Sequence, residues 1–535
     1  MADINADWSA DSNDAIHISL VTPSVGGTTS IHTFNPKFTY SIFGDEESIF
    51  GYQGLKINLK YNASDMRPGL QITYNKKFKA VGDIEPTDLK AVLEPFLPKT
   101  AFEKSSVFES NISAIPADWH PPGELFRTIE IGGETFEIWK GNLSDPFVQQ
   151  TIKRIQILVP FFIEGGTLLD LDESEDDLGR WTVFFLYQKK QSTATFFEKS
   201  SSYIFTGFST VYRYYMYTPT TPPQSPNGDK IAPEFTLPVD GVSFDTLPCR
   251  SRISQFMILP PFQSGGKGSI FYNAIFDYLY DDPYTREITV EDPNEAFDDL
   301  RDINDFARLR KDARFQQLKL NSGLKIKPKG PAPTKLFDTK AYEEIRAQMK
   351  IAPRQFARVH EMYLLSLIPQ SVKQAPLHED EEETSKKSLP PPNKEDEHIY
   401  HLWQLLVKQR LYRHNKDALA QLDRGERIDK LNETLMGVEV DYGRLIETVN
   451  ERSEKQKAIE IGKGKGILNG EWKEGSCRRR RRGRCLGALE FTDDIKECFK
   501  MYSRFCIQMN EGGNEEKGEW MNGNVNRRDE RDERG

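Results

Sequence analysis

The segment that most constrains the fold runs from residue 251 to residue 269 and reads SRISQFMILPPFQSGGKGS. It starts as an apolar, strand-like stretch and ends in a glycine-rich turn. Residues 268–280 then have the apolar spacing of a helix, REITV (286–290) is a short apolar strand, and 293–311 has helical spacing again. This order of strand, glycine turn, helix, strand and helix is typical of α/β proteins, so we expect that fold class.

The size and charge of the chain limit what it can do. With 535 residues it is long enough for two or three domains with real cores. Its 71 Lys and Arg residues are outnumbered by 81 Asp and Glu residues, which gives a net charge of −10. Such a balance disfavours direct nucleic-acid binding and suits a basic partner, for example a cationic peptide.

Signals for secretion, membrane insertion and metal binding are not evident. The N-terminus, MADINADWSADSNDA, has no basic or apolar leader, and no run of about 18 apolar residues occurs, so we expect a soluble protein without a membrane span. Only Cys249 precedes residue 477, which indicates a reducing compartment. The four later cysteines lack close CxxC pairs, so no metal site is expected.

The composition divides the chain into four parts. Residues 1–165 are mixed, with strand-like LKINLKY (55–61) and LQITYN (70–75) and a long half-buried helix over 147–164. Residues 166–335 hold three aromatic, β-branched strands at 181–190, 203–217 and 253–262, with a solvated loop insertion at 218–248. Residues 336–460 are helical at 341–367 and 398–450, around an acidic linker at 376–398. Residues 461–535 lose apolar periodicity, and we expect them to be disordered or an artefact of the gene model.

The glycine turn QSGGKGS (263–269) is the first candidate binding site. Because it follows a strand and opens a helix, successive backbone N–H groups there could hold a diphosphate. The alternative is a simple strand-to-helix turn. No Gly-Lys-Ser/Thr ending follows, so an ATP-hydrolysing phosphate loop is not favoured.

The acidic residues after REITV separate into groups by what local structure already requires. Asp292, Pro293 and Glu295 are predicted as the N-cap, first residue and capping-box acid of the next helix. Four later aspartates lie opposite an apolar helical face and are predicted to be a solvated face: Asp298, Asp299, Asp302 and Asp305. Glu291 is left at a strand end, where an open α/β sheet presents groups to a ligand.

A carboxylate at this place could act as a general base for an amine. Lysine has a reference pKa of about 10.4, so its amine must lose a proton before it can attack a thioester. Glu291 could take that proton directly or through water. The alternative is a strand-end carboxylate that only forms a salt bridge.

Several long motifs together resemble one enzyme family. The stretches 251–269 and 288–302, and also 40–57, 210–217 and 350–365, are similar to the catalytic subunits of type B histone acetyltransferases, which belong to the GNAT superfamily. The resemblance covers roughly residues 8–450. It implies an α/β (α+β) fold: a GNAT core over 166–335 that binds acetyl-CoA, a mixed N-terminal domain that contacts the histone tail, and a C-terminal helical region.

The resemblance also assigns roles to individual residues. Glu291 would be the general base, and a second set would contact histone: Asp45, Glu46, Glu47, Trp181, Tyr212, Arg213 and Tyr214. Acetyl-CoA would be bound by Phe256, Met257, Ile258, Gln263, Ser264, Gly265, Gly266, Lys267, Gly268, Ser269 and Asn294. Carboxylates attract a basic peptide and aromatic rings cover its aliphatic stems. A solvated turn at residues 45–47 and plain core packing of the two tyrosines are the alternatives.

The expected activity is acetyl transfer from acetyl-CoA to a lysine in the N-terminal tail of newly made histone H4. The resemblance implies direct attack in a ternary complex, no metal, a WD40-repeat histone-binding subunit as partner, and a location in nucleus and cytoplasm. Cys249 has no evident activating histidine, which disfavours an acetyl-cysteine route. The alternatives are a GNAT enzyme that acetylates another amine and a non-catalytic histone-binding scaffold. The 218–248 loop, the acidic linker and the tail depart from the family pattern.

Overall fold

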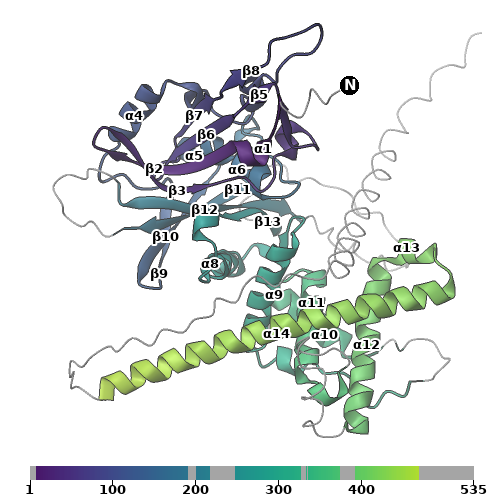
Figure 1. The fold of residues 1–535 in the computed structure, drawn as a ribbon. Coiled ribbons are helices and arrows are strands. Elements are labelled where there is room, and N and C mark those ends of the chain that lie inside the picture. The colour runs from purple at the N-terminus through teal and green to yellow at the C-terminus, as the bar shows by residue number, and fades with distance from the viewer. Residues whose placement is uncertain are drawn as a thin grey trace, which may run out of the picture. The chain divides into compact units, whose positions relative to one another are not determined.

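The computed structural model describes residues 8–190, 201–216, 247–326, 333, 335–373 and 392–468. Residues 1–460 form one compact unit, and residues 461–535 are a second. Most of the predicted loop insertion (218–248), most of the acidic linker (376–398) and the tail beyond residue 468 lie outside the described residues. Figure 1 shows the strands in the first part of the chain and the helices that follow them.

The N-terminal part is built on a four-stranded sheet of order β3-β2-β6-β7. β2 and β6 are parallel, and the other two pairs are antiparallel. Alternate residues of β6 are buried, as the period of two in LKINLKY predicts. The elements are β1 (Ser9–Asp11), α1 (Ser12–Ala15), β2 (Ile16–Ser24), β3 (Gly27–Phe34), α2 (Tyr40–Phe43), β4 (Ser48–Phe50), β5 (Tyr52–Gln53), β6 (Lys56–Asn62), β7 (Pro68–Thr73), β8 (Lys76–Lys77), α3 (Leu89–Leu93) and α4 (Ser105–Ser113).

The long helix predicted over 147–164 is wrong as a single element. The structure has α5 (Pro146–Ile155) and α6 (Leu158–Phe162) instead. Pro160 explains the break, because it has no N–H and its ring would clash with the carbonyl four residues earlier, at Gln156. Gln156 is the C-cap of α5, directly after its last residue, Ile155.

A six-stranded sheet of order β14-β13-β12-β11-β10-β9 forms the centre of the molecule. Neighbouring strands are antiparallel except β13 and β14, which are parallel. The three predicted aromatic strands are confirmed as β11, β12 and β13, and REITV lies in β14, so the mixed α/β class is confirmed. The strands are β9 (Glu124–Ile131), β10 (Glu134–Asn142), β11 (Trp181–Lys189), β12 (Tyr203–Tyr215), β13 (Cys249–Ile258) and β14 (Thr285–Val290), with α7 (Glu175–Leu178) before β11.

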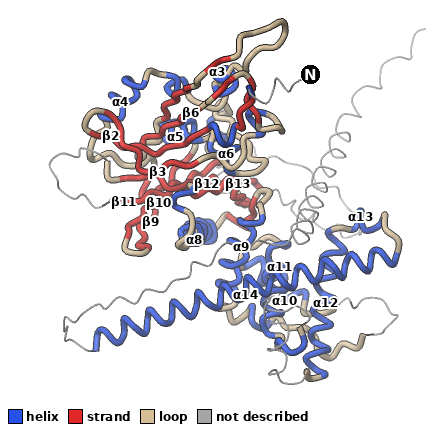
Figure 2. Tube along the Cα trace, in the orientation of Figure 1, coloured by secondary structure: helices blue, strands red, loops and turns tan. Residues whose placement is uncertain are grey.

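Helices dominate from α8 onward, as Figure 2 shows. They are α8 (Lys267–Asp281), α9 (Glu295–Leu309), α10 (Thr339–Gln348), α11 (Pro353–Leu367), α12 (Lys394–His414), α13 (Lys416–Ala420) and α14 (Arg424–Leu468). α8 packs on β13 and β14. The Phe256 ring of β13 lies 5.2 Å from Phe271 of α8 and 5.0 Å from Phe297 of α9, so both helices cover one face of the sheet.

The aspartates of α9 correct the prediction of a solvated face. Asp302 and Asp305 are buried, because α11 packs against this side of α9. Gln355 of α11 donates to both carboxylates, at 2.9 Å and 3.0 Å, and Arg358 forms an ion pair with Asp302 at 2.5 Å. The sequence suggested solvation because these partners lie about 50 residues further along the chain.

The described residues contain neither a membrane-spanning helix nor a metal-binding cluster. Within 8–190, 201–216, 247–326, 335–373 and 392–468, no helix is long and apolar enough to cross a membrane. The same part of the chain holds no group of three or more His, Cys, Asp or Glu side chains placed to bind a metal ion.

Candidate active site at the ends of β13 and β14

The candidate site lies where β14 ends and β13 continues beyond it, paired only with β12. The last register pair joins Ile253 to Val290, and the Glu291 N–H donates to the Ile253 carbonyl at 2.9 Å. β13 extends to Ile258, and among the described strands residues 254–258 have a partner only on the β12 side. The diverging carboxyl ends of two parallel strands therefore leave an open sheet edge, which is where α/β folds bind ligands.

A β-bulge at Ser254 shapes this crevice. The register of β12 and β13 passes from Thr210 with Gln255 to Val211 with Ile253, so Ser254 is the extra residue of β13. Bulges bend a strand and redirect a side chain. Here the Ser254 hydroxyl donates to Oε2 of Glu291 in a short hydrogen bond.

Glu291 is held at both carboxylate oxygens. Arg252 Nη1 donates to Oε1 at 2.9 Å, while Ser254 holds Oε2. The Glu291 side chain remains 39% exposed, so a substrate amine can reach it. The carboxylate is thus fixed in direction without being shut off from the crevice.

An aromatic cluster continues from this carboxylate across the sheet. Trp181, Tyr212 and Arg252 are register partners on three neighbouring strands, so their side chains share a face. The ring centres of Trp181 and Tyr212 are 4.7 Å apart, and those of Tyr212 and Tyr214 are 4.6 Å apart. The Arg252 guanidinium lies 4.3 Å from the Tyr214 ring centre, and we call Trp181, Tyr212, Tyr214, Arg252 and Glu291 the base–aromatic cluster.

The cluster is partly buried and partly open. Tyr214 is 37% exposed, whereas burial is the main cause that raises the pKa of Tyr212. Arg180 lies 4.6 Å from the Tyr212 ring centre and also bonds the Arg213 carbonyl. The exposed edge of the cluster has the apolar and π character that suits the stem of a lysine or arginine.

Arg213 does not join this cluster. It lies between Tyr212 and Tyr214 on β12, so its side chain projects to the opposite face of the sheet. There its guanidinium bonds Asp282 at 2.5 Å, just after α8. The predicted histone contact by Arg213 therefore stays a prediction, and the structure gives the residue a different local partner.

The loop between β13 and α8 has the geometry of an anion-binding turn. Ser264, Gly265 and Gly266 are consecutive residues with positive φ angles of 71°, 65° and 82°. Gly266 is the N-cap of α8 and has no side chain to cap the helix, so the first N–H groups of α8 have neither an intrahelical acceptor nor a side-chain partner there. These donors, together with the positive helix end, suit a diphosphate.

Other residues predicted to bind acetyl-CoA surround this loop. Gln263 donates to the Ile258 carbonyl at 2.9 Å, which ties the turn to the open edge of β13, and Lys267 lies 5.6 Å from the Phe136 ring centre. Ser269 accepts hydrogen bonds from Asn304 and from Arg452 of α14, at 3.1 Å and 3.2 Å.

The remaining predicted residues of this set lie on β13 and in the first turn of α8. Met257 and Ile258 are buried, whereas Phe256 is half-buried between α8 and α9. Gly268 is in the first turn of α8, where an added Cβ would lie 3.5 Å from Leu300.

The start of α9 corrects a second prediction. The N-cap is Asn294, whose Oδ1 accepts from the Phe297 N–H at 2.9 Å, and the helix begins at Glu295. Asp292 has a φ of 31°, which lies outside the extended region that N-caps adopt, so its predicted capping role is wrong. Asn294 therefore has a structural role beside its predicted contact with acetyl-CoA.

The acidic residues 45–47 follow α2. Asp45 and Glu46 are exposed, whereas Glu47 accepts from the N–H groups of Thr39 and Tyr40, at 2.6 Å and 3.1 Å. The bond from the Thr39 N–H is the main cause that lowers the pKa of Glu47. Glu47 thus stabilises the start of α2, while Asp45 and Glu46 are available to a basic ligand.

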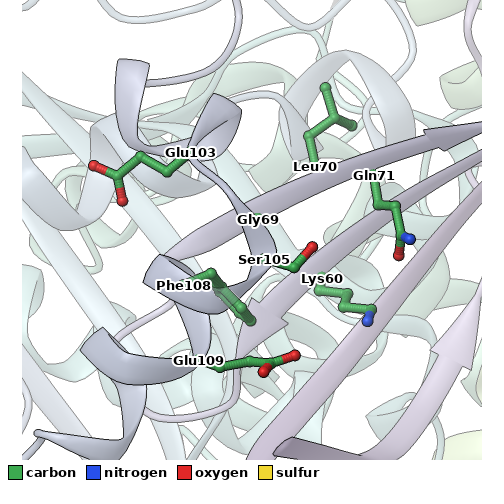
Figure 3. Close-up of a pocket in the computed structure, with 8 residues that line it drawn as sticks. All are labelled: Lys60, Gly69, Leu70, Gln71, Glu103, Ser105, Phe108 and Glu109. Atoms are coloured by element: carbon green, nitrogen blue, oxygen red, sulfur yellow. The ribbon is translucent and has the colours of Figure 1, made fainter.

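A small pocket elsewhere in the molecule contains none of these residues. Figure 3 shows it on the N-terminal part, between strands β6 and β7 and the start of α4. Its lining consists of Lys60, Gly69, Leu70, Gln71, Glu103, Ser105, Phe108 and Glu109. The Phe108 ring closes it over Gly69, where an added Cβ would lie 2.8 Å from that ring.

Sequence reasoning missed Arg252 and Ser254. The stretch SRIS placed both residues beside Ile253, and alternation would put them on one face of a strand. Their contact with Glu291 depends on the bulge and on the end of β14. Both features arise from pairing between distant segments, and the local sequence shows neither.

Comparison with known protein families supports a specific relationship. Residues 8–164 match the model "Histone acetyl transferase HAT1 N-terminus", and residues 302–367 match "Fungal HAT1, C-terminal". A protein from Gibberella zeae named histone acetyltransferase type B catalytic subunit is 46% identical over 473 residues, covering 87% of this chain and 95% of that protein. Proteins of the same name are 47% identical in Neurospora crassa (84% and 90% covered) and 31% identical in Candida albicans (82% and 90% covered).

Proposed function

This chain belongs to the family of type B histone acetyltransferase catalytic subunits, and from that premise we propose that it acetylates a lysine in the N-terminal tail of histone H4. Acetyl-CoA would be the acetyl donor and Glu291 the general base. The observation that carries the proposal is the position of the Glu291 carboxylate. It stands at the open ends of β13 and β14, oriented at both oxygens and still accessible.

The proposed reaction needs one proton acceptor and no covalent enzyme intermediate. Glu291 removes a proton from the substrate ammonium, and the freed nitrogen attacks the thioester carbonyl carbon. The new C–N bond gives a tetrahedral intermediate, and the C–S bond then breaks; the nitrogen loses its second proton, and the leaving sulfur takes one up. Because the amine is almost fully protonated at neutral pH, a positioned base contributes roughly 10²–10⁴-fold to such a step.

The residues present fit acetyl-CoA. The unpaired edge of β13 over residues 254–258 can add an extended, amide-bearing chain as a further strand would add. The glycine turn and the first turn of α8 supply the donors for the diphosphate. The strand leads directly into the turn, so one continuous surface serves both ends of the ligand.

The base–aromatic cluster and the acidic loop suit a basic peptide. The rings of Tyr212, Tyr214 and Trp181 lead away from Glu291, so they can cover the stem of the reacting lysine. Exposed Asp45 and Glu46, and the net charge of −10, favour a cationic tail. These features support a histone tail as the peptide, and the choice of histone H4 rests on the family.

The direct test compares amine substrates with purified protein. We expect acetyl-CoA to be consumed with a histone H4 tail peptide far faster than with unrelated peptides, free N-termini or small amines. Equal rates for all amines would indicate a different acetyltransferase. A non-catalytic scaffold would bind the tail and leave acetyl-CoA intact in every case.

We propose a WD40-repeat histone-binding subunit as partner and both nucleus and cytoplasm as locations. The relatives are named as catalytic subunits, which is consistent with further subunits. The boundaries at residues 165, 335 and 460 likewise remain predictions about how the chain divides.

A further inference from the structure

We propose that Arg252 is a positioning residue that fixes the Glu291 carboxylate and the Tyr214 ring relative to each other. The base and the aromatic ring that covers the peptide are then held in one arrangement, which we call the proposed unit. This inference rests on the proposed function of Glu291. The observation behind it is that a single guanidinium contacts both groups. Its Nη1 donates to Glu291 Oε1 at 2.9 Å, and its centre lies 4.3 Å from the Tyr214 ring centre.

The first half of the inference concerns the carboxylate. Ser254 alone would hold one oxygen of Glu291 and leave the side chain free to turn about that bond. Arg252 holds the other oxygen, so the two contacts together fix the plane of the carboxylate. A base must lie within about 2.6–3.2 Å of the nitrogen that carries the proton it removes, and misplacement by about 1 Å can cost about 100-fold in rate.

The second half of the inference concerns the Tyr214 ring of the base–aromatic cluster. Tyr214 is more than a third exposed and lies near the end of β12, so fewer neighbours pack against its ring than against a buried one. Its ring contacts the Tyr212 ring and the Arg252 guanidinium. A planar guanidinium can bond a carboxylate in its plane while its face covers a ring, which a lysine ammonium cannot do in the same way.

Neighbouring charged groups do not duplicate this arrangement. Arg180 bonds the Arg213 carbonyl and Asp177, and its ring contacts are with Tyr212 and Tyr215. Asp292 is exposed and follows Glu291 in the turn. Among the described residues, Arg252 is therefore the cation that contacts both Glu291 and Tyr214.

Arg250 provides a matched control on the same strand. It lies two residues before Arg252 on the same face of β13, and it also forms an ion pair with a glutamate of the β14 strand, Glu287, at 2.8 Å. It is the cross-strand register partner of Tyr214, but among the described residues its guanidinium forms no ion pair with Glu291 and no cation–π contact with a ring of the base–aromatic cluster. Replacing Arg250 thus removes the same charge from the same strand and leaves both Arg252 contacts of the proposed unit, with Glu291 and with the Tyr214 ring, in place.

The test is a set of variants measured by single-turnover acetyl transfer to a histone H4 tail peptide, with acetyl-CoA affinity measured separately by calorimetry. We expect Arg252→Ala to lower the transfer rate at saturating substrates by roughly 10- to 100-fold, to raise the peptide KM a few-fold, and to leave acetyl-CoA affinity within about twofold. Arg250→Ala should change each quantity by less than about twofold. Arg252→Lys keeps the charge and the fold, and we expect it to lose at least about tenfold in rate.

The decisive measurement repeats Arg252→Ala in the Glu291→Gln background. If Arg252 acts through Glu291, the second substitution should add less than about threefold to the loss. A full, multiplicative loss in that background, or equal effects of Arg252→Ala and Arg250→Ala, or wild-type transfer by Arg252→Lys, would each overturn the inference. Wild-type transfer by Glu291→Gln alone would instead overturn the proposed base, so the two failures are distinguishable.

Discussion

Two groups of carboxylates lie close together in the sequence and have opposite surroundings. Glu291 ends β14 with a half-open carboxylate that two side chains orient. Asp302 and Asp305 of α9 are buried, and Arg358, Gln355 and Tyr272 bond them from neighbouring helices. The acidic run therefore contains one carboxylate that is placed to meet a ligand and others that hold helices together.

This difference shows that exposure to solvent and the number of hydrogen-bonding partners distinguish the two roles. Charge does not, because both groups carry it. A buried carboxylate is stable only when hydrogen bonds and a cation replace its lost hydration. A catalytic carboxylate needs a fixed direction and a free approach.

The largest effect is expected from Glu291→Gln. Glutamine keeps the size and can still bond Arg252 and Ser254, but it cannot accept the amine proton. We expect turnover of the histone H4 tail peptide to fall by roughly 10²–10⁴-fold, with the free energy of unfolding changed by less than about 0.5 kcal/mol. Steady-state kinetics and urea unfolding measure the two quantities.

Asp302→Ala should instead lower the free energy of unfolding strongly. It leaves the Arg358 guanidinium buried without its carboxylate, which typically costs about 3–5 kcal/mol. Asp299→Ala is the matched control on the same helix, because it removes an exposed ion pair with Arg444 that contributes about 0–1 kcal/mol. Urea unfolding of the two variants checks this, and a similar small loss for both would contradict the structural role of Asp302.

The burial of His360 predicts that the stability of the helical part depends on pH. Burial lowers its pKa to about 4, below the ordinary histidine value of 6.5, while Nε2 lies 2.9 Å from the Leu318 carbonyl. Because the folded pKa is the lower one, the unfolded state binds more protons between these values. Its stabilising contribution is therefore present above about pH 6.5 and is lost as the pH falls toward 4.

From pH 7 to pH 5 we expect the free energy of opening of α11 to fall by about 2 kcal/mol through this residue. Amide hydrogen exchange of α11 measures it. His360→Gln can still donate to the Leu318 carbonyl but does not titrate, so it should flatten this dependence. An unchanged slope in that variant would assign the effect to other groups.

The smallest expected effect distinguishes two candidate helix caps. Asn294→Ala removes the bond to the Phe297 N–H and should destabilise α9 by about 1 kcal/mol. Asp292→Ala should cost less, because Asp292 does not cap the helix and alanine there loses only the tolerance of aspartate for the positive φ of 31°. Thermal or urea unfolding measures the loss of stability in both variants. A larger loss for Asp292→Ala than for Asn294→Ala would support the cap predicted from the sequence.

Much of the fold was predictable because local patterns were strong. Aromatic and β-branched residues marked β11, β12 and β13, and the glycine turn marked the start of α8. Glu291 could be singled out because it directly follows an apolar strand. In each case the signal and the structure it predicts lie in the same short segment.

The errors arose where the deciding partner was distant or where two local signals competed. Asp302 looked solvated because Arg358 and Gln355 come from α11, which the pattern of α9 cannot reveal. The local pattern also did not indicate that Arg213 pairs with Asp282 on the far side of the sheet, and its predicted histone contact stays a prediction. At the start of α9 both Asp292 and Asn294 are good caps by type, and backbone geometry decided between them.

The most direct test of the central claim is a single-turnover measurement on Glu291→Gln with acetyl-CoA and a histone H4 tail peptide both at saturation. Under these conditions binding no longer limits the rate, and only the transfer step is observed. We predict a transfer rate at least about 100-fold below wild type, with both ligands bound at wild-type affinity. A wild-type transfer rate would contradict the assignment of Glu291 as the base.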